Sequence, residues 1–514
     1  MFTRTGGYYP AINAATLSLI AGDAARSREL AAVVLRRLAE SGDDSYYAAA
    51  TAAEAHLLLG DEAAAGAALG KAAARHGEDY GALASTRRQL RAICEIRDVN
   101  PELLAPLAGP GVVYFCGHRI AAERGEGRFP AGAEARAAAR IVEVVTGRRA
   151  GYAYGALAGG ADILWAEALL TQGCELHVVL PFARLEFVEL SVAVCGPGWV
   201  QRFARCLEAA TEVRYATDDA FLGDDVLFRY GGELAMGLAL VRARYLDAEA
   251  WQLALWDGKP ALGDAGTAID VATWRAAGRP VTIVSPDGEI TTSPGEPSGG
   301  GIDQTLGTSA AGGPRAAGSA SGALRRGGSG RVVRAMLFGD VRGFSTLTDE
   351  QLPTFATRVL GALAEVVERH RDEVWHRNTW GDAVYVVLTD AAAAAACALD
   401  LQDAMASIAM ESEGLPAHLA LRLGGHVGPV FPTYDPVLRA DGFMGSHVSR
   451  TARIEPVTPP GTVYVTEAFA AALVLSADRA LTCDYVGHMA AAKGYGNLRM
   501  YRLRRTSGGD DPLR

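Results

Sequence analysis

The sequence has no uncharged apolar run of about 18 residues, the length that a helix needs to cross a bilayer. Its opening stretch, MFTRTGGYYP, also lacks the apolar core of a secretory signal peptide. The formal net charge of −10 argues against a non-specific nucleic-acid binder, because phosphate backbones need a basic face. We therefore expect a soluble cytoplasmic protein that binds neither membrane nor nucleic acid. A small anionic ligand is compatible with this charge, since helix ends and a few basic side chains suffice for it.

Cysteines are few, and their spacing fits neither a CxxC metal or redox motif nor a disulfide framework. We expect reduced thiols in the core. The seven are Cys94, Cys116, Cys174, Cys195, Cys206, Cys397 and Cys483. At 514 residues, with 49% hydrophobic and 21% charged residues, the chain is long enough for about three globular domains.

Residues 1–108 are rich in alanine and leucine, and their apolar positions recur at spacings of three and four residues. Short breaks at Gly22-Asp23, 41–44 and Gly60-Asp61 divide this stretch into a series of short antiparallel helix pairs. The unit SYYAAATAAEAHLLLGDEAAAGAALGKAAA resembles a tetratricopeptide-type pair. Such a surface binds a protein partner or packs on its own chain, and both alternatives stay open.

The pattern changes at Gly111 to short apolar runs separated by helical stretches. The runs VVYFCG, ELHVVLPF, WQLALW and PVTIVSP are rich in β-branched and aromatic residues, as buried parallel strands are. Residues 109–286 are therefore predicted to form a doubly wound, Rossmann-like α/β domain. Glycines follow two of its strands, at Gly159-Gly160 and around Gly266, and the amides of such helix starts can hold a phosphate.

These two turns, with CGHR at 116–119, resemble a Rossmann-like superfamily that includes the cytokinin-activating phosphoribohydrolases and the DNA-processing protein A type. In that group a GGxGTxxE segment lines a nucleotide site; in this chain Asp264 replaces the second glycine and Asp270 the glutamate. Three interpretations stay open: a sensor of a nucleotide-like ligand, an inert scaffold, and an N-glycosidic nucleotide hydrolase. The resemblance implies a second ligand site formed by Gly159, Gly160, Gly263, Gly266, Thr267 and Asp270.

Residues 287–330 are dominated by glycine, serine, alanine and proline, and large apolar residues are almost absent. We predict a flexible linker, because nothing in this segment could offset the entropy of ordering it. Such a tether transmits little torque, so coupling across it has to act through domain docking or dimerisation. Residues 507–514 are predicted to be a disordered tail.

Two aspartates in the remaining region, 331–506, each lie at the edge of an apolar, strand-like run. Asp340 lies in LFGDVRGFSTLT and Asp382 in NTWGDAVYVVL. Two carboxylates brought together at strand ends form an oxygen-ligand site for hard divalent cations, which would in turn hold a triphosphate. The order strand, helix, paired strands, helix, strand predicts a ferredoxin-like α+β fold.

Over essentially its whole length this region resembles a class III nucleotidyl cyclase catalytic domain. FGDVRGFSTLT and TWGDAV match the two metal-aspartate segments, which implies two divalent cations, Mg²⁺ or Mn²⁺, on Asp340 and Asp382. GFMGSHVSRTARIEP places Arg453 at the transition-state arginine, and KGYGNLRMY places Lys493 at the phosphate-binding lysine. The resemblance assigns nucleotide contacts to Val341, Arg342, Gly343, Phe344, Ser345, Asn378, Asp441 and Gly442.

The implied reaction is attack of a ribose 3′-hydroxyl on the α-phosphorus of its own triphosphate, with release of pyrophosphate. One cation lowers the pKa of the hydroxyl and the other holds the departing phosphates, while Arg453 and Lys493 neutralise charge on the phosphoryl oxygens. The family assembles each site across a dimer, with the aspartates from one protomer and the arginine from the other. The resemblance therefore implies a homodimer.

Two parts of the motif set depart from the family. Ser449 stands where the family usually has asparagine, and losing one oriented hydrogen bond lowers a rate by about 10² to 10³ at worst, which weakens activity without excluding it. The base-selecting positions hold Asn378 and Gly442, whereas adenylate-making members carry lysine with aspartate or threonine, and guanylate-making members carry glutamate and cysteine. An amide can donate or accept, so Asn378 fits either purine or a pyrimidine. ATP is favoured because Asp441 can accept from an exocyclic amino group.

We therefore predict a nucleotidyl cyclase that is gated by N-terminal sensor domains. Two alternatives come from other classes of function. One is a catalytically weak or inactive nucleotide-binding interaction protein, which Ser449 and Asn378 support. The other is a nucleotide N-glycosidic hydrolase in residues 109–286.

Overall fold

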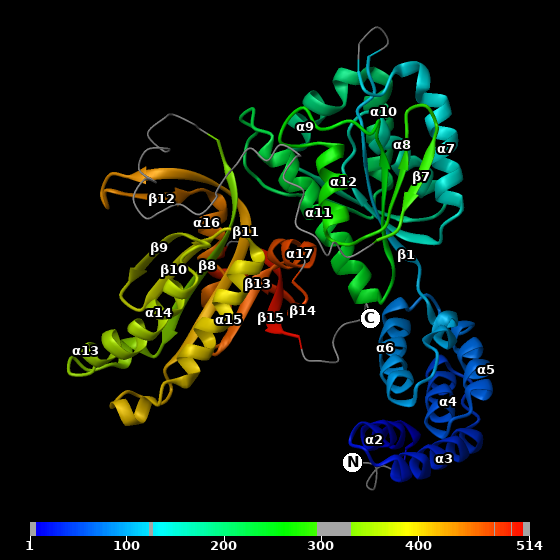
Figure 1. Ribbon diagram of the computed structural model, residues 1–514, viewed down its shortest axis with the longest axis horizontal. Helices are drawn as coiled ribbons and strands as arrows, with labels where there is room; N and C mark the ends of the chain where they lie inside the picture. Colours follow the sequence, from blue (N-terminus) through cyan, green and yellow to red (C-terminus); the bar gives the residue numbers. More distant parts are fainter. Residues whose placement is uncertain (1–6, 123–126, 296–329, 477, 495, 507–514) are drawn as a thin grey trace. The chain divides into compact units, whose positions relative to one another are not determined.

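A computed structural model describes residues 7–122, 127–295, 330–476, 478–494 and 496–506 (Figure 1). The predicted tail and residues 296–329 of the predicted linker lie outside this set. The described chain forms two compact units. The first contains the described residues up to Gly111 together with Arg242–Glu249, and the second contains Val112–Val241 and the described residues from Ala250 onward. None of the described helices has the length and apolar character that a membrane crossing needs.

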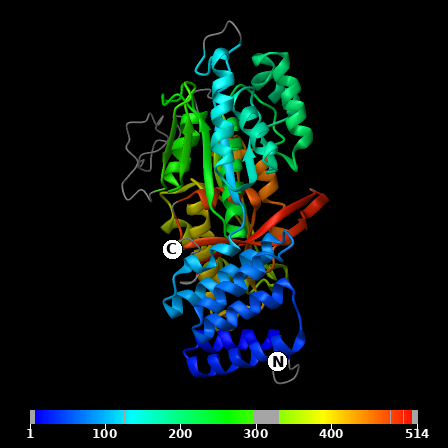
Figure 2. The same ribbon diagram turned by 90° about the vertical axis from the view of Figure 1, so that its right-hand side faces the viewer.

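Helices separated by short capped turns form the first unit (Figure 2). At the turn after the third of them, Gly60 adopts a left-handed conformation (φ 87°) and the Asp61 carboxylate accepts a hydrogen bond from the amide of Ala64 at 3.0 Å. The helical character predicted for this region is confirmed, whereas its assignment to a tetratricopeptide-type repeat stays a prediction. The elements are α2 (Tyr8–Ile20), α3 (Ala24–Ser41), α4 (Tyr46–Leu59), α5 (Glu62–Ala73), α6 (Tyr80–Arg97) and η1 (Pro101–Leu107).

A buried carboxyl group, that of Glu54 on α4, joins three of these helices. It accepts hydrogen bonds from the Thr16 hydroxyl of α2 at 2.5 Å and from the Gln89 amide of α6 at 2.7 Å. Burial raises the pKa of Glu54 to about 7, although both hydrogen bonds oppose the shift. The folded unit therefore binds a proton at Glu54 more tightly than the unfolded chain does.

Glu54→Gln is expected to remove a pH dependence of stability. A carboxyl whose folded pKa lies above its unfolded value stabilises the fold below the unfolded pKa, and this contribution is lost as pH rises through the folded pKa of about 7. The variant should therefore match the wild type near pH 4.5 and be more stable at pH 8, by up to about 3 kcal/mol. Thermal unfolding of the full chain at both pH values measures this. If the difference in stability between Glu54→Gln and the wild type were the same at both pH values, the raised pKa assigned to Glu54 would be wrong.

Seven strands form the first sheet of the second unit, in the order β4-β3-β2-β1-β5-β6-β7. The pairs β4–β3, β3–β2, β1–β5 and β5–β6 are parallel, β6 and β7 are antiparallel, and the strand order reverses at β1. We call this part, from β1 to β7, the parallel-sheet region. Its elements are β1 (Gly111–Gly117), η2 (Ala131–Ala133), α7 (Glu134–Thr146), β2 (Ala150–Gly155), α8 (Ala161–Thr171), β3 (Glu175–Leu180), α9 (Arg184–Ser191), η3 (Ala193–Cys195), α10 (Pro197–Ala209), β4 (Glu212–Tyr215), α11 (Val226–Leu246), β5 (Ala250–Leu255), α12 (Thr267–Ala276), β6 (Val281–Val284) and β7 (Ile290–Ser293).

Both faces of this sheet are covered. On β1, Val113 and Phe115 pack in one apolar cluster with residues of α7 and α8, whereas Tyr114 points the other way and bonds Asp270 on α12. The predicted α/β alternation with a parallel sheet is confirmed, and the more specific Rossmann-like assignment stays a prediction.

Ile290–Ser293, which were expected to belong to the linker, instead form β7, since their amides pair with β6.

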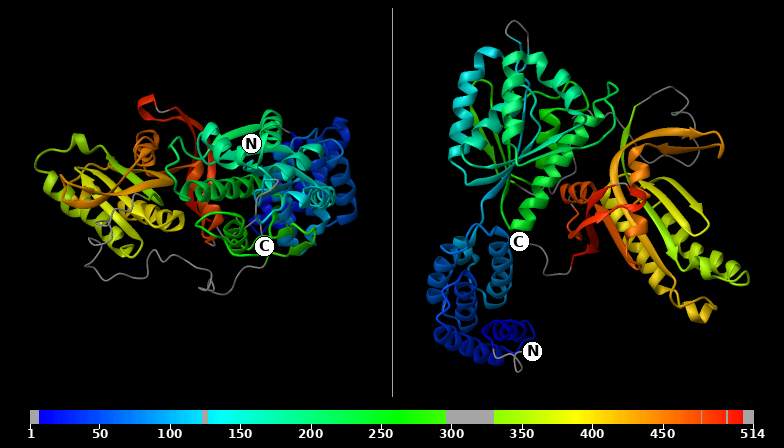
Figure 3. Two further views of the ribbon diagram at one scale, coloured as in Figure 1. Left: turned by 90° about the horizontal axis from the view of Figure 1, so that it is seen from above. Right: turned by 180° about the vertical axis from the view of Figure 1, so that it is seen from behind.

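A second, eight-stranded sheet builds the C-terminal region, in the order β14-β15-β13-β11-β8-β10-β9, with β12 paired to β11 (Figures 1 and 3). The succession β8, α14, β9, β10, α15, β11 confirms the predicted ferredoxin-like order. The strands are β8 (Val332–Arg342), β9 (Val374–Trp380), β10 (Ala383–Leu388), β11 (Ala420–Asp435), β12 (Ala440–Met444), β13 (Thr462–Thr466), β14 (Leu481–Ala490) and β15 (Asn497–Arg505). The helices are η5 (Phe344–Thr346), α13 (Leu352–Thr354), the π-helix η6 (Phe355–Leu360), α14 (Gly361–Arg369), α15 (Ala391–Ser407), η7 (Met410–Glu413), α16 (Ser446–Thr451), η8 (Glu455–Val457), α17 (Glu467–Leu475) and η9 (Ala492–Gly494).

Side chains of β8 alternate between the two faces of this sheet. Ala335 and Leu337 belong to the main core with α14 and α15, whereas Met336 lies on the opposite face, in a smaller cluster that Val448 of α16 joins. We call this opposite face the α16 face. All seven cysteines are free, and all but the half-buried Cys483 are buried, so they lie in the core as expected.

Candidate functional site

The two aspartates that were predicted to form a metal pair do meet in the structure. Asp340 lies four residues after Met336 on β8 and therefore on the α16 face. Asp382 lies in the tight turn between β9 and β10, where Gly381 takes the left-handed conformation (φ 62°) that a glycine adopts without strain. Each of the two carboxyl groups shifts the pKa of the other.

Of the two carboxyl groups, Asp382 holds a proton more tightly. Burial, followed by the hydrogen bond and the negative charge of Asp340, raises the pKa of Asp382 to about 7. Burial opposes ionisation of Asp340 as well, but hydrogen bonds from Asp382 and Arg422 outweigh it and lower the pKa of Asp340. Near neutral pH the pair therefore carries less negative charge than two free carboxylates would.

Arg422 and Glu455 complete the charged cluster, and neither was predicted. Arg422 lies directly opposite Asp340 in the antiparallel register of β11 and β8, and its guanidinium forms an ion pair with that aspartate. The same guanidinium nitrogen lies 2.8 Å from Oε1 of Glu455. Burial raises the pKa of Glu455 to about 7. Cross-strand register could have identified Arg422, but only once the pairing of β8 with β11 was known.

The donor set of this pair suits a hard divalent cation. Both side chains offer carboxylate oxygens, and a cation between them would replace the proton that now relieves their repulsion. Among the described residues no group of three or more His, Cys, Asp or Glu side chains is arranged to hold a metal. Further ligands would thus have to come from water, backbone or substrate oxygens, as is common for Mg²⁺.

The segment 341–345, predicted to bind the nucleotide, comprises the last two residues of β8, Gly343 and the first two residues of η5. Val341 is buried in the main core, so only its backbone faces the site, where it bonds the Asp382 carboxyl. Gly343 has a positive φ of 93°, and a Cβ atom there would lie 2.8 Å from the His418 ring. Phe344 begins η5, and its ring centroid lies 4.9 Å from that of Phe355 with the two rings tilted by 53°. The turn is therefore fixed by packing.

The predicted base-selecting positions lie on neighbouring elements. Asn378 is on β9, two residues after His376, while Asp441 and Gly442 are on β12. The His376 ring nitrogen Nδ1 lies 3.0 Å from the carbonyl oxygen of Asp441, and its Cε1 would be 3.8 Å from a Cβ atom on Gly442. His376, which was not predicted, thus joins β9 to β12. The side-chain oxygen of Asn378 accepts from the amide of Thr379 at 2.8 Å.

The remaining predicted catalytic residues lie on α16 and in the segments that follow it. Ser449 is exposed on α16, and Arg453 follows the helix in a turn closed by its amide on the carbonyl of Arg450 at 3.0 Å. The Arg453 carbonyl accepts from the amide of Ala492 at 3.2 Å, at the start of η9. The backbone of Lys493 belongs to η9, but its side chain lies outside the described residues.

At the expected second ligand site, several amides of the Gly159-Gly160 turn are already bonded within the chain. The Gly159 amide donates to Ser191 O at 2.8 Å, and the Ala161 amide donates to His118 O at 3.1 Å. A phosphate at this turn would have to displace these carbonyls. The phosphate-binding role of Gly159 and Gly160 therefore stays a prediction that these bonds do not support.

The second glycine turn leads into α12. A Cβ atom on Gly263 would lie 2.4 Å from the Asp225 carboxylate, and Gly266 has a φ of 120° immediately before Thr267. The Asp270 carboxylate accepts from the Tyr114 hydroxyl at 3.0 Å, and burial raises its pKa to about 7. Asp270 is thus held by β1, and a ligand role for Gly263, Gly266, Thr267 and Asp270 stays a prediction.

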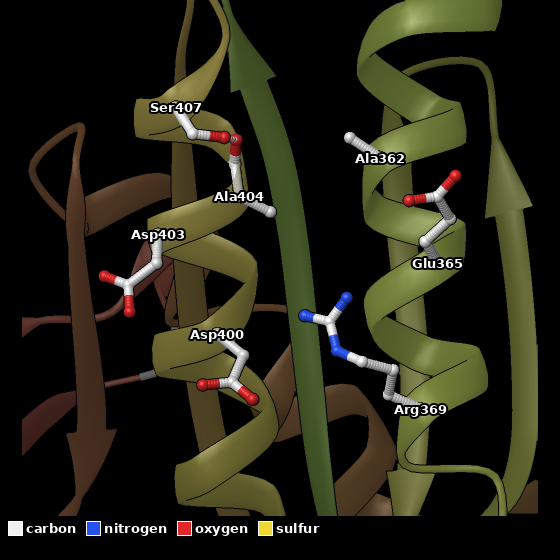
Figure 4. A pocket seen from close by; sticks show the side chains of 7 residues that line it. All are labelled: Ala362, Glu365, Arg369, Asp400, Asp403, Ala404 and Ser407. Atoms are coloured by element: carbon white, nitrogen blue, oxygen red, sulfur yellow. Dashed lines mark hydrogen bonds between the residues drawn. The ribbon is translucent and has the colours of Figure 1, made fainter.

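An open depression between α14 and α15 is lined by acidic side chains and one arginine (Figure 4). It lies on the face of the sheet opposite Asp340. Asp400 in its wall already pairs with Arg505 at 2.8 Å. This depression is therefore separate from the candidate site. Its lining residues are Ala362, Glu365, Arg369, Asp400, Asp403, Ala404 and Ser407.

Comparison with known proteins matches the C-terminal region to one family. The model of the adenylate and guanylate cyclase catalytic domain matches residues 332–505. Similar solved structures include the adenylyl cyclase CyaB from P. aeruginosa, with 17% identity over 35% of this chain and 97% of that one and a TM-score of 0.31. The guanylate cyclase domain of RhGC from Catenaria anguillulae, solved with GTP, has 16% identity over 34% and 97% and a TM-score of 0.30. The guanylyl cyclase Cya2 has 20% identity over 35% and 95% and a TM-score of 0.30.

No curated protein matches the chain. The family match begins at the first residue of β8 and ends at the last residue of β15, so it covers the whole second sheet. Residues 332–505 are an adenylate and guanylate cyclase catalytic domain.

Proposed function

We propose that the protein converts a nucleoside triphosphate, with ATP favoured, to a 3′,5′-cyclic nucleotide and pyrophosphate. The observation that carries this proposal is the Asp340–Asp382 pair, in which burial and the charge of Asp340 raise the pKa of Asp382 to about 7 beside the Asp340–Arg422 ion pair. Such an arrangement is unfavourable without a cation and well suited to one. It lies on the α16 face of a domain that matches the cyclase family.

Asp340 and Asp382 would hold two divalent cations, Mg²⁺ or Mn²⁺, between the protein and the triphosphate. When bound, these cations lower the pKa of the ribose 3′-hydroxyl and neutralise the departing pyrophosphate. Arg422, which is paired with Asp340 and Glu455, keeps the Asp340 carboxylate ionised and oriented. The backbone amides of the turn at Gly343 would donate hydrogen bonds to phosphate oxygens.

Arg453 and Lys493 would stabilise the negative charge that develops on the phosphoryl oxygens, and Ser449 would bond the ribose. Among the described contacts, no hydrogen bond or ion pair joins the Arg453 side chain to either aspartate. We therefore propose a homodimer, in which the aspartates of one protomer meet the Arg453 of its partner. Each dimer then has two equivalent sites.

Base recognition is assigned to the junction of β9 and β12. Asn378 would contact the base from β9, and Asp441 and Gly442 from β12, where the His376 ring nitrogen lies 3.0 Å from the Asp441 carbonyl oxygen. The Asp441 carboxylate could accept from the exocyclic amino group of adenine, which favours ATP. His376 becomes a further candidate for base contacts.

The other proposals concern the N-terminal part. We propose that the parallel-sheet region senses a nucleotide-like ligand and that the helical unit binds a protein partner. A nucleotide-binding protein without turnover is the second candidate function, because Ser449 is exposed and shorter than asparagine. It predicts calorimetric binding of triphosphate with no product.

The proposed activity is tested by incubating the full chain with each of the four ribonucleoside triphosphates, with Mg²⁺ or Mn²⁺, and separating the products. A 3′,5′-cyclic nucleotide, formed fastest from ATP, is expected. Absence of cyclic product from all four, with the dimer intact, would reject the proposal. Release of a free base instead, lost in Asp270→Asn, would favour a hydrolase in the parallel-sheet region.

A further inference from the structure

A short segment of the parallel-sheet region contacts the first turn of α16. This segment, Thr217–Asp219, lies between β4 and α11. The Thr217 hydroxyl lies 3.0 Å from Nε2 of His447, and the Ser446 hydroxyl donates to the Asp219 carboxylate at 2.9 Å. Thr217 is 2% exposed and His447 is completely buried. The contact is therefore shielded from water, which strengthens its hydrogen bonds.

The Thr217–His447 contact is one end of a buried chain of four side chains. His447 Nδ1 lies 2.8 Å from Nε2 of His426, and His426 Nδ1 lies 2.7 Å from the Thr466 hydroxyl. Burial lowers the pKa of His447 to about 3 and that of His426 well below its usual range, so both rings are neutral. A neutral imidazole donates a hydrogen bond from one ring nitrogen and accepts one at the other. The side chains of Thr217, His447, His426 and Thr466 therefore all have hydrogen-bond partners only when every link of the chain is intact. Removing the Thr217 hydroxyl leaves a buried nitrogen of His447 unpaired.

Close packing surrounds this chain. The Tyr230 hydroxyl of α11 donates to the carbonyl of Val427 at 3.0 Å, and its ring meets the His447 ring edge-on at 5.9 Å. A Cβ atom on Gly237 of α11 would lie 2.2 Å from the carbonyl oxygen of Ala471 on α17, so the two helices touch at their backbones. Tyr230 is buried in the same apolar core as β8 and β11. The segment Thr217–Asp219 thus has little freedom to move independently of the cyclase domain.

We propose that Thr217 is a positioning residue for the cyclase reaction, because it fixes the orientation of α16 and with it Ser449 and Arg453. This inference rests on the function proposed above. Ser449 lies two residues after His447 and Arg453 six residues after it, on the same helix and the turn that closes it. A displacement of about 1 Å at such a group can lower a rate about 10²-fold.

Coupling between the parallel-sheet region and the cyclase domain would therefore act through the contact of Thr217–Asp219 with α16 and not through the linker. A ligand or partner that shifts β4 or α11 would shift α16 through Thr217. The parallel-sheet region then sets the turnover rate and leaves the Asp340–Asp382 pair unchanged.

The test compares Thr217→Val, which keeps the shape and loses the hydroxyl, with Thr217→Ser, which keeps the hydroxyl. Thr217→Val is expected to lower kcat for ATP about tenfold to hundredfold with little change in KM, as for an interaction that matters in the transition state. Thr217→Ser should retain a kcat close to that of the wild type. Thr171→Val is the matched control, since its hydroxyl bonds only Glu167 O within α8.

Hydrogen exchange provides a readout that does not depend on turnover. Thr217→Val should speed exchange of the amides of α16 and leave those of α14 unchanged. The positioning role is wrong if the exchange rates of the α16 amides and kcat of Thr217→Val both match those of the wild type. It is also wrong if kcat rises. If α16 loosens but the wild type itself makes no cyclic nucleotide, the cyclase proposal fails and Thr217 positions α16 without serving this reaction.

Discussion

Asp382→Ala is expected to abolish cyclic nucleotide formation, with a fall in kcat of at least about 10³-fold. The alanine removes one of the two carboxylates that would hold the cations, and Asp340 would be left paired with Arg422 alone. The fold should survive, because Asp382 lies in a turn and its carboxyl repels that of Asp340. Turnover with ATP and Mn²⁺ measures the loss, and circular dichroism checks the fold.

Asp372→Ala is the matched control for this variant. Asp372 lies in the turn before β9, and its side chain is 85% exposed. The control should keep wild-type turnover, since surface substitutions of this kind seldom matter. If Asp382→Ala also kept the wild-type rate, the assignment of the metal site to this pair would be wrong.

Arg453→Ala is expected to lower kcat by about 10² to 10³-fold, because a charged donor to the phosphoryl oxygens is lost. Substrate binding should change less, as the triphosphate keeps its contacts with the aspartate side of the site. Steady-state measurement of kcat and KM separates the effect on turnover from the effect on substrate binding.

The Arg453→Ala variant also tests whether each site is shared between two protomers. An equal mixture of Arg453→Ala and Asp382→Ala chains should regain about a quarter of wild-type activity, since half of the dimers are mixed and each mixed dimer has one intact site. If Arg453 served the aspartates of its own chain, no mixture would regain activity. Each variant alone is the control.

Local pattern was enough to predict the aspartate pair. Asp340 and Asp382 each lie at the edge of an apolar run, and the alternation of β8 fixes the face to which Asp340 points. Arg422 could not be predicted in the same way, because its position beside Asp340 depends on the pairing of strands 82 residues apart. His376 was missed for the same reason, since its partner Asp441 lies on a separate strand pair.

Predictions from single turns were less secure. The Gly159-Gly160 turn has the composition of a phosphate cradle, but the Gly159 amide is satisfied by the Ser191 carbonyl, which comes from a later helix. The strands β2 and β4 were not predicted, because AGYAYG and EVRY are short and weakly apolar. Docking of Thr217 on His447 joins residues 230 positions apart, and no local pattern indicates it.

The most direct test of the account is the balance of products from ATP. The full chain, with Mg²⁺ or Mn²⁺, should form 3′,5′-cyclic nucleotide and pyrophosphate in equal amounts, and Asp382→Ala should form neither. ATP that stays intact with the wild type, or cyclic product that persists in Asp382→Ala, would contradict the proposed two-carboxylate site.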